Sequence, residues 1–156
     1  MLIKENVEIK NYTTYKIGGT VEKVYFPESH AEFTELLRTL EDYLVLGSCS
    51  NVLISSNGYA GNIIMTTELK QYEIRGLKIF ASCGVKGPLL SQKAAEASLS
   101  GFEFMIGFPA SIGGAVYMNA GAYKSDMGYI VESVLVLTPE LEIKKMMNKE
   151  LNYHYR

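Results

Sequence analysis

A short run of small and polar residues has the composition of an anion-binding loop. Gly47 to Asn51 lies between two apolar segments, residues 43–46 and 52–54, that we expect to be strands. Small residues let several backbone N–H groups point at one place, and such a concavity binds a phosphate or pyrophosphate without cationic side chains. The alternative is an ordinary polar connection, in which Ser and Asn favour a turn. The candidate binding residues are Gly47, Ser48, Cys49, Ser50 and Asn51.

A second segment, residues 107–123, is rich in glycine and almost uncharged. Its glycines leave room where another group must approach the backbone. Ser111 is expected to cap a helical turn that starts at Ile112, whose N-terminal amides would face a ligand. The alternative is a tightly packed crossing in which glycines let two elements touch. The candidate binding residues are Pro109, Ala110, Ser111, Ile112, Gly113, Gly114, Asn119 and Gly121.

Together, the two segments predict one long ligand that is anionic in one part and flat and apolar in another. A flavin or a nucleotide dinucleotide fits that description. The first loop is not a P-loop, because it lacks the Gly-Lys-Ser/Thr ending, and it is not the GxGxxG dinucleotide motif. The sequence therefore indicates a binding mode outside those two common classes.

Charge and composition narrow the classes of partner. The 156 residues are 47% hydrophobic and 21% charged, which is typical of one globular domain or two small lobes. The net charge of −2 provides no basic surplus for binding nucleic acid or a membrane surface. No apolar run reaches the length of a membrane span and the N-terminus lacks a signal-peptide core, so we expect a cytoplasmic protein.

The two cysteines, Cys49 and Cys83, do not have the spacing of metal ligands, and no metal site is predicted. We expect two free thiols in a reducing compartment, with a disulfide as the alternative. Cys49 is interpreted as a small buried side chain rather than as a thiol activated by nearby amide dipoles.

The elements that must position these loops alternate between strands and helices, with frequent hairpins. Ser29 is expected to cap a helix that ends near Leu40, with Glu32 completing a capping box. A second helix is expected from Pro88 to about Leu99. The pattern points to an α+β fold, or to α/β with mixed sheets, rather than to a doubly wound parallel sheet. Further strands are expected at residues 21–26, 62–66, 70–75, 77–83, 131–137 and 142–146.

Several blocks of the sequence resemble, in their order and spacing, those of the UDP-N-acetylenolpyruvoylglucosamine reductase family. These are flavoenzymes of peptidoglycan synthesis. The similarity extends over nearly the whole chain, and the block at residues 108–123 is highly specific. The matching blocks are residues 11–19, 46–53, 108–123 and 153–156.

The resemblance implies an α+β, two-lobed FAD-binding fold of the vanillyl-alcohol-oxidase (PCMH) type, with FAD between the lobes. We expect one lobe in residues 1–68 and the other in residues 69–156. In the family, the loops that match residues 47–51 and 109–114 embrace FAD, and the first contacts mainly its pyrophosphate. The candidate residues of both loops are therefore expected to bind FAD.

The same resemblance implies an activity. A reductase of this family takes electrons from NADPH and passes a hydride to the enolpyruvyl group of UDP-N-acetylglucosamine enolpyruvate, which gives UDP-N-acetylmuramate. The implied partner is thus a UDP-sugar. Arg156 matches the family's active-site arginine, and a guanidinium stabilises negative charge on a neighbouring carboxylate. The alternative is a non-catalytic flavin- or nucleotide-binding module.

The chain departs from the family pattern in three ways. Ser48 and Cys49 replace two glycines of the first loop, and Cys49 would be strained if its φ were positive. Ala110 replaces the glycine that usually follows Pro109. No segment resembles the family's substrate-binding lobe, which supplies a proton-donating serine and a late glutamate. We therefore expect the chain to be the N-terminal, FAD-binding part of a longer enzyme and to be inactive alone.

Overall fold

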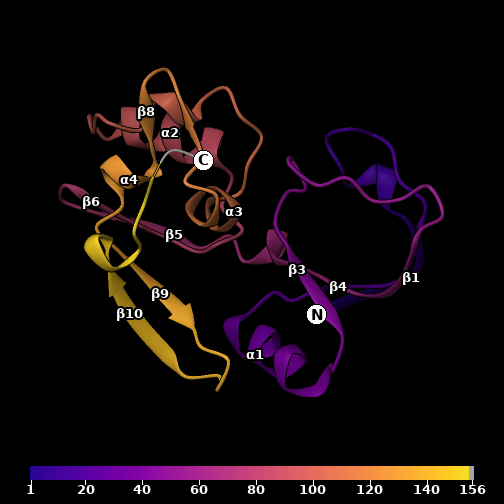
Figure 1. Ribbon diagram of the computed structural model, residues 1–156. Helices are drawn as coiled ribbons and strands as arrows, with labels where there is room; N and C mark the ends of the chain where they lie inside the picture. Colours follow the sequence, from indigo (N-terminus) through magenta and orange to yellow (C-terminus); the bar gives the residue numbers. More distant parts are fainter. Residues whose placement is uncertain (155–156) are drawn as a thin grey trace.

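The computed structural model describes residues 1–154, which form two lobes (Figure 1). The first lobe is a four-stranded sheet of order β1-β2-β4-β3 with one helix. β1 is antiparallel to β2, whereas β2 and β3 both run parallel to β4. The elements of this lobe are β1 (Leu2–Glu8), β2 (Thr20–Phe26), α1 (His30–Thr39), β3 (Tyr43–Leu46) and β4 (Tyr59–Met65).

Side chains on the central strands alternate between two apolar cores. Val24 and Ile63 are buried in one core, whereas the next residues along each strand, Tyr25 and Ile64, pack with Leu36 of α1 in the other. Successive side chains of a strand point to opposite faces, so a sheet covered on both sides buries consecutive apolar residues. This burial fixes β2 and β4 between the two cores, and β3 pairs with β4.

The connection between β3 and β4 is a loop, residues 47–58, without a helix or a strand. The predicted strand at residues 52–54 is therefore wrong. Because β3 and β4 are parallel, the chain must cross from the end of β3 back to the level at which β4 starts. Residues 47–58 make this crossover without pairing with any strand. The apolar alternation has a different cause, because Val52 and Ile54 pack against the core while Leu53 is 70% exposed.

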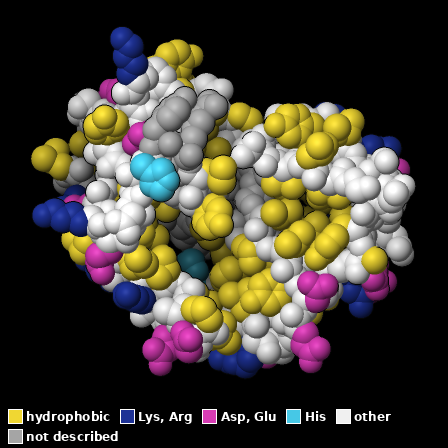
Figure 2. Space-filling view, viewed as in Figure 1, with side chains coloured by type: hydrophobic (Ala, Val, Ile, Leu, Met, Phe, Trp, Pro, Cys, Tyr) yellow, Lys and Arg dark blue, Asp and Glu magenta, His cyan; other side chains and the backbone are white. Residues whose placement is uncertain are grey.

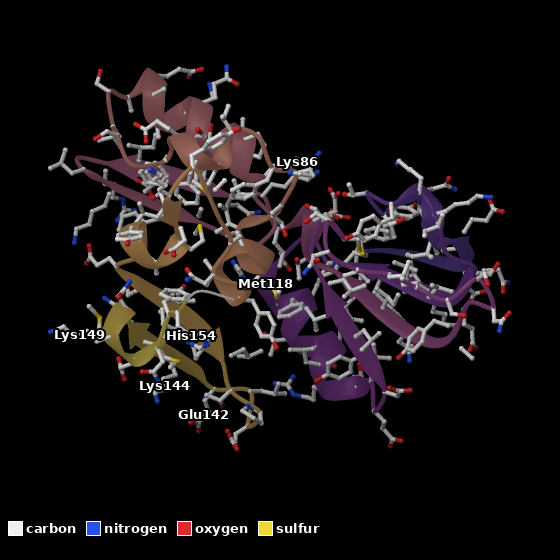
Figure 3. The ribbon with its side chains drawn as sticks, turned by 45° about the horizontal axis from the view of Figure 1, so that its top comes forward. Lys86, Met118, Glu142, Lys144, Lys149 and His154 are labelled. Atoms are coloured by element: carbon white, nitrogen blue, oxygen red, sulfur yellow. The ribbon has the colours of Figure 1, made fainter. Side chains whose placement is uncertain are left out.

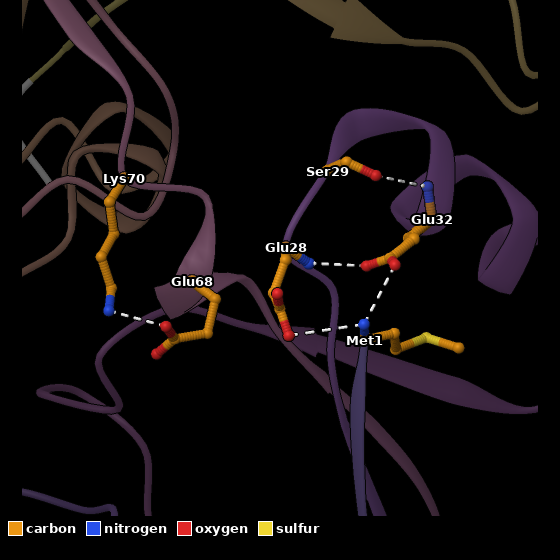
Figure 4. A network of polar contacts seen from close by, with 6 residues as sticks. All are labelled: Met1, Glu28, Ser29, Glu32, Glu68 and Lys70. Atoms are coloured by element: carbon orange, nitrogen blue, oxygen red, sulfur yellow. Dashed lines mark hydrogen bonds and ion pairs between the residues drawn. The ribbon is translucent and has the colours of Figure 1, made fainter.

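The predicted start of α1 is confirmed. The Ser29 hydroxyl accepts a hydrogen bond from the Glu32 backbone N–H at 3.2 Å (Figure 4). The carboxylate of Glu32 does not return to the Ser29 N–H, as a full capping box would require. It accepts instead from the Glu28 N–H at 2.8 Å and from the Met1 amino group at 3.0 Å, which ties the chain's first residue to the helix.

The second lobe is built from hairpins and short helices around its own core. Pairing within it is antiparallel, between β5 and β6, β7 and β8, and β9 and β10. The buried residues of this core all lie between positions 85 and 127: Val85, Leu90, Phe104, Met105, Ile112, Ala115 and Met127. The elements are β5 (Tyr72–Arg75), β6 (Lys78–Ala81), α2 (Gly87–Glu96), α3 (Ile112–Tyr117), β7 (Gly121–Ala122), β8 (Ser125–Asp126), α4 (Met127–Ile130), β9 (Ser133–Leu137) and β10 (Ile143–Met147).

The remaining predicted elements are present within a few residues of their expected bounds, although α2 is shorter than expected and β1, β7, β8 and α4 were not predicted. α2 ends at Glu96 rather than near Leu99, because Ser98 has a φ of +58° and leaves the helical conformation. β1 was not predicted, because most of its side chains are exposed and carry no apolar alternation. No helix in residues 1–154 is long and apolar enough to span a membrane.

Candidate functional site

The two predicted binding loops meet at Ser48 and Ser111. The Ser48 backbone N–H donates a hydrogen bond to the Ser111 Oγ at 3.3 Å, and Ser111 is only 1% exposed. A Cβ on Gly47 would overlap that same Oγ, so a larger residue at position 47 would force the Ser111 hydroxyl out of its contact with the Ser48 N–H. The structure thus brings together residues from both candidate sets.

The contact corrects the expected role of Ser111. The residue stands at the N-cap position of α3 in an extended conformation, as predicted, but its side chain makes no capping hydrogen bond. Its hydroxyl serves the loop of the other lobe instead. Sequence spacing predicts local caps, whereas this partner lies 63 positions away.

The second loop is held by the segment that precedes α2. Backbone N–H groups of Gly87, Ile112 and Gly113 donate to carbonyls of Ala110, Val85 and Cys83 at 2.8–2.9 Å. A Cβ on Gly113 would lie 2.6 Å from the Cys83 Cβ, whereas a Cβ on Gly114 would meet only the Ser111 Oγ, at 3.6 Å. Packing inside the lobe therefore explains Gly113, and Gly114 leaves open space beside the first loop.

A cavity of about 410 Å³ adjoins this meeting point. Ser48 contributes to its wall, yet the Ser48 Oγ is buried and has no hydrogen-bond partner among the described residues. A buried hydroxyl without a partner costs about 1–3 kcal/mol, and a serine side chain has other staggered χ1 rotamers in which it can find one. The cavity is lined by Tyr12, Thr13, Thr14, Lys16, Ser48, Lys86, Pro88 and Pro109.

Sequence reasoning missed most of this lining. The segment 11–19 contributes Tyr12, Thr13, Thr14 and Lys16, and its only signal was its resemblance to a family block. Lys86 had no signal, because an isolated lysine is normally a solvated surface residue. Figure 3 shows Lys86 between the two lobes, and Figure 2 shows a hollow between them with hydrophobic side chains on its borders.

Cys49 is a structural residue of the first loop, as predicted. Its φ is +50°, the left-handed conformation in which a side chain other than glycine is strained. The side chain is 3% exposed, and burial raises the pKa of its thiol to about 11. Its carbonyl accepts a hydrogen bond from the Thr14 N–H at 3.2 Å, which holds the segment 11–19 against the loop. Cys49 and Cys83 are both free thiols.

The other candidates occupy different surroundings. Pro109 lines the cavity, and Ala110 supports α2 through its carbonyl. Ser50 is partly exposed and Asn51 is exposed, both on the first loop, and Ile112 is buried in the second core. Arg156 lies outside the described residues.

Asn119 and Gly121 have evident structural tasks away from the cavity lining. Asn119 accepts from the Gly128 N–H at 2.9 Å and donates to the His154 carbonyl at 3.1 Å. A Cβ on Gly121 would lie 2.6 Å from the Ser125 carbonyl oxygen, so the β7–β8 pair requires glycine there. Their assignment to a cofactor stays a prediction.

Residues 21–146 match the family described as the FAD binding domain. The chain belongs to this FAD-binding family. The matched range includes both loops and most of each lobe. The FAD-binding domain contains no cluster of His, Cys, Asp and Glu side chains suited to a metal ion within residues 1–154.

The FAD-binding domain is also similar to named reductases. It is 40% identical over 152 residues to the UDP-N-acetylenolpyruvoylglucosamine reductase of Caldicellulosiruptor bescii, covering 95% of this chain and 48% of the relative. The crystal structure of the same enzyme from Thermus caldophilus matches with a TM-score of 0.86 at 34% identity, over 99% of this chain and 56% of that one. The chain spans about half the length of the curated relatives it matches.

A more distant structure confirms the fold expectation. An alkyldihydroxyacetonephosphate synthase matches with a TM-score of 0.62 at 15% identity, over 85% of this chain and 27% of that one. At such an identity the likeness concerns the fold alone. With the family match, it confirms the α+β, two-lobed FAD-binding fold of the PCMH type.

Proposed function

We propose that this chain is the FAD-binding portion of an NADPH-dependent reductase that converts UDP-N-acetylglucosamine enolpyruvate to UDP-N-acetylmuramate. The names of its relatives support the reaction, and the family match supports the cofactor. The single observation that carries the site is the orphaned Ser48 hydroxyl in the wall of the cavity where the two loops meet. The corresponding partners are FAD, NADPH and a UDP-sugar, in the cytoplasm.

The residues around the cavity fit FAD. Ser48 offers an unused hydroxyl, Thr14 lines the same wall, as does Thr13, whose hydroxyl donates to the Ile17 carbonyl at 3.3 Å, and Gly114 leaves space beside the loop. These groups suit a polar, anionic part of a ligand, because hydroxyls and backbone amides donate hydrogen bonds to phosphate oxygens. When bound, FAD supplies the redox chemistry by accepting electrons from NADPH and passing a hydride to the substrate.

The protein's own contribution is binding, orientation and charge stabilisation. We assign the binding of FAD between the lobes to the two loops. The proposed cofactor-binding residues are 47–51, 109–114, Asn119 and Gly121. We assign Arg156 to the stabilisation of negative charge on the substrate carboxylate, because a guanidinium keeps its charge at any working pH and presents parallel donors. We place the boundary between the two lobes after residue 68, so that the first lobe comprises residues 1–68 and the second residues 69–156.

A spectrum of the purified chain tests this proposal. After incubation with excess FAD and gel filtration, the chain is expected to retain near-stoichiometric flavin, with absorption bands near those of free flavin. Loss of all flavin at micromolar protein concentrations would contradict the assignment of FAD to this chain. In the protein encoded by the complete gene, reoxidation of reduced flavin by the enolpyruvyl substrate separates a reductase from a flavin-binding module without catalysis.

A further inference from the structure

The cavity beside Ser48 carries two positive charges that have no ion-pair partner in the part of the chain that the structure describes. Lys16 and Lys86 both line it, and no Asp or Glu of the described chain does. Within residues 1–154, neither lysine takes part in an ion pair, whereas Lys10, Lys23, Lys70, Lys78 and Lys93 all do. In a chain with a net charge of −2, the cavity is a local concentration of positive charge.

The two lysines come from different lobes and have fixed backbones. Lys16 belongs to the first lobe, where its N–H donates to the Thr13 carbonyl at 3.3 Å in a turn tied to Cys49 by Thr14. Lys86 is the N-cap residue of the ten-residue α2 in the second lobe. The N-terminus of a helix carries a partial positive charge, which adds to that of the lysine beside it.

A third feature of the cavity indicates what these charges would bind. Ser48 lines the same wall, and its buried Oγ has no hydrogen-bond partner within residues 1–154. Two ammonium groups, a helix N-terminus and a free hydroxyl match a ligand with several anionic oxygens spread over more than one centre. A diphosphate has this chemistry, and a single carboxylate does not use all four groups.

We propose that Lys16 and Lys86 clamp the diphosphate of the bound dinucleotide, one lysine from each lobe. The inference rests on the proposed FAD site and deepens it, because it names the residues that neutralise the ligand and select it. Flavins that end in one phosphate or none would lose part or all of this attraction. The clamp makes affinity depend on ionic strength, since the attraction acts between charges that salt screens.

Charge-removing variants test the clamp directly. Dissociation constants for FAD, FMN and riboflavin are measured by flavin fluorescence for the wild-type chain, Lys16→Gln, Lys86→Gln and the double variant. Each single variant is expected to weaken FAD binding by about 10- to 100-fold, the range of one hydrogen bond to a charged group. Riboflavin affinity is expected to stay unchanged, and the double variant is expected to lose most of the salt dependence.

Two control variants show whether a loss of FAD affinity is due to the charge of these two lysines. Lys149→Gln removes a charge from an exposed lysine that lies far from Lys86 (Figure 3), and it should leave FAD affinity within twofold. Lys86→Arg keeps the charge and should retain most of the affinity. Equal FAD affinity in the wild type and the double variant overturns the clamp while the proposed function stands.

A second ligand separates failure of the clamp from failure of the FAD assignment. Binding of ADP, which contains a diphosphate without a flavin, is followed by calorimetry in the same variants. If the chain binds ADP but no FAD, and both lysine variants lose ADP, the clamp is supported and the FAD assignment fails. If the wild type binds neither ligand, both are overturned.

Discussion

Ser48 and Ser111, 63 positions apart in the chain, are joined by a hydrogen bond of 3.3 Å from a backbone N–H to a side-chain oxygen. The bond links the two candidate binding loops and crosses from one lobe to the other. The glycine at position 47 permits it, because any Cβ there would occupy the place of the Ser111 hydroxyl. The conformation of the first loop and the position of the second lobe against it therefore depend on the same contact.

We expect Gly47→Ala and Ser111→Ala to be less damaging together than the sum of their separate effects. Gly47→Ala alone should lower the free energy of unfolding by about 1–3 kcal/mol through overpacking. Ser111→Ala alone should cost about 1 kcal/mol by leaving the Ser48 N–H without its partner. In the double variant the added methyl would meet the Cβ of residue 111 at 3.5 Å and the Gly114 backbone nitrogen at 3.9 Å, both of which are ordinary contacts.

Urea denaturation of the four proteins measures this coupling as a double-mutant cycle. Ser100→Ala, at an exposed serine in the same lobe, provides the control and should change stability by less than about 0.5 kcal/mol. Strictly additive effects would show that the two positions do not share the space that the structure gives them.

Gly113→Ala and Gly114→Ala are expected to change stability in opposite directions. The new methyl on residue 113 would lie 2.6 Å from the Cys83 Cβ and should destabilise the fold by about 1–3 kcal/mol. The methyl on residue 114 meets no close atom, and alanine favours a helix over glycine by up to about 1 kcal/mol. Thermal unfolding without ligand distinguishes the two, and equal destabilisation would argue against this difference in packing.

Gly114→Val tests whether the open space beside Gly114 belongs to the ligand. A branched side chain would fill room that the flavin cofactor is expected to use, so FAD affinity should fall by at least about 10-fold. Fluorescence titration gives the dissociation constant, and circular dichroism checks that the variant is folded. Unchanged affinity in a folded variant would remove Gly114 from the cofactor site.

The stability of the chain is expected to fall as pH rises from about 9 toward 11. Burial raises the pKa of the Cys49 thiol from 9.0 to about 11, so in this window the unfolded chain loses the proton that the folded chain keeps. The unfolded state then binds fewer protons, and the free energy of unfolding decreases with pH. Below pH 9 both states are protonated and this contribution is complete.

Denaturant titrations at several alkaline pH values, with Cys49→Ala as the reference, isolate this contribution. The variant should show a shallower decline, because the two proteins differ only in the thiol at position 49. Alkylation by iodoacetamide at pH 8 should also be slower for Cys49 in the folded protein than in urea. A steep alkaline decline that is identical in both proteins would exclude Cys49 as its source.

Asn119→Asp is expected to separate two contacts that one amide makes. Aspartate still accepts from the Gly128 N–H and tolerates the φ of +45° at this position, but it does not donate to the His154 carbonyl. Hydrogen exchange of peptides that cover residues 150–154 should accelerate, while exchange near Gly128 stays protected. Asn119→Ala should accelerate both regions, and no change in either variant would show that the amide is dispensable.

The parts of the site that could be predicted were those governed by local chemistry. The loop from Gly47 to Asn51 can be recognised in the sequence because small residues follow an apolar strand. The cap of α1 by Ser29 can be recognised from the spacing between Ser29 and Glu32. The Ser48–Ser111 contact and the clamp lysines depend on how distant segments pack, and neither leaves a local pattern. Residues 52–54 show a misleading local pattern. Their apolar side chains predicted a strand, but Val52 and Ile54 pack against the core in a segment that pairs with no strand.

The separation of the cores has a consequence for the order in which the chain is made. All buried residues of the two sheet cores lie between positions 7 and 65, whereas the core of the second lobe begins with Val85. A growing polypeptide therefore possesses every pairing partner of β1 to β4 before α2 is translated, and N-terminal units generally fold first during synthesis. Lys86 and Ser111 are translated after the strands of the first sheet, so the cavity between the loops is completed only once the later-synthesised lobe docks onto a preformed sheet.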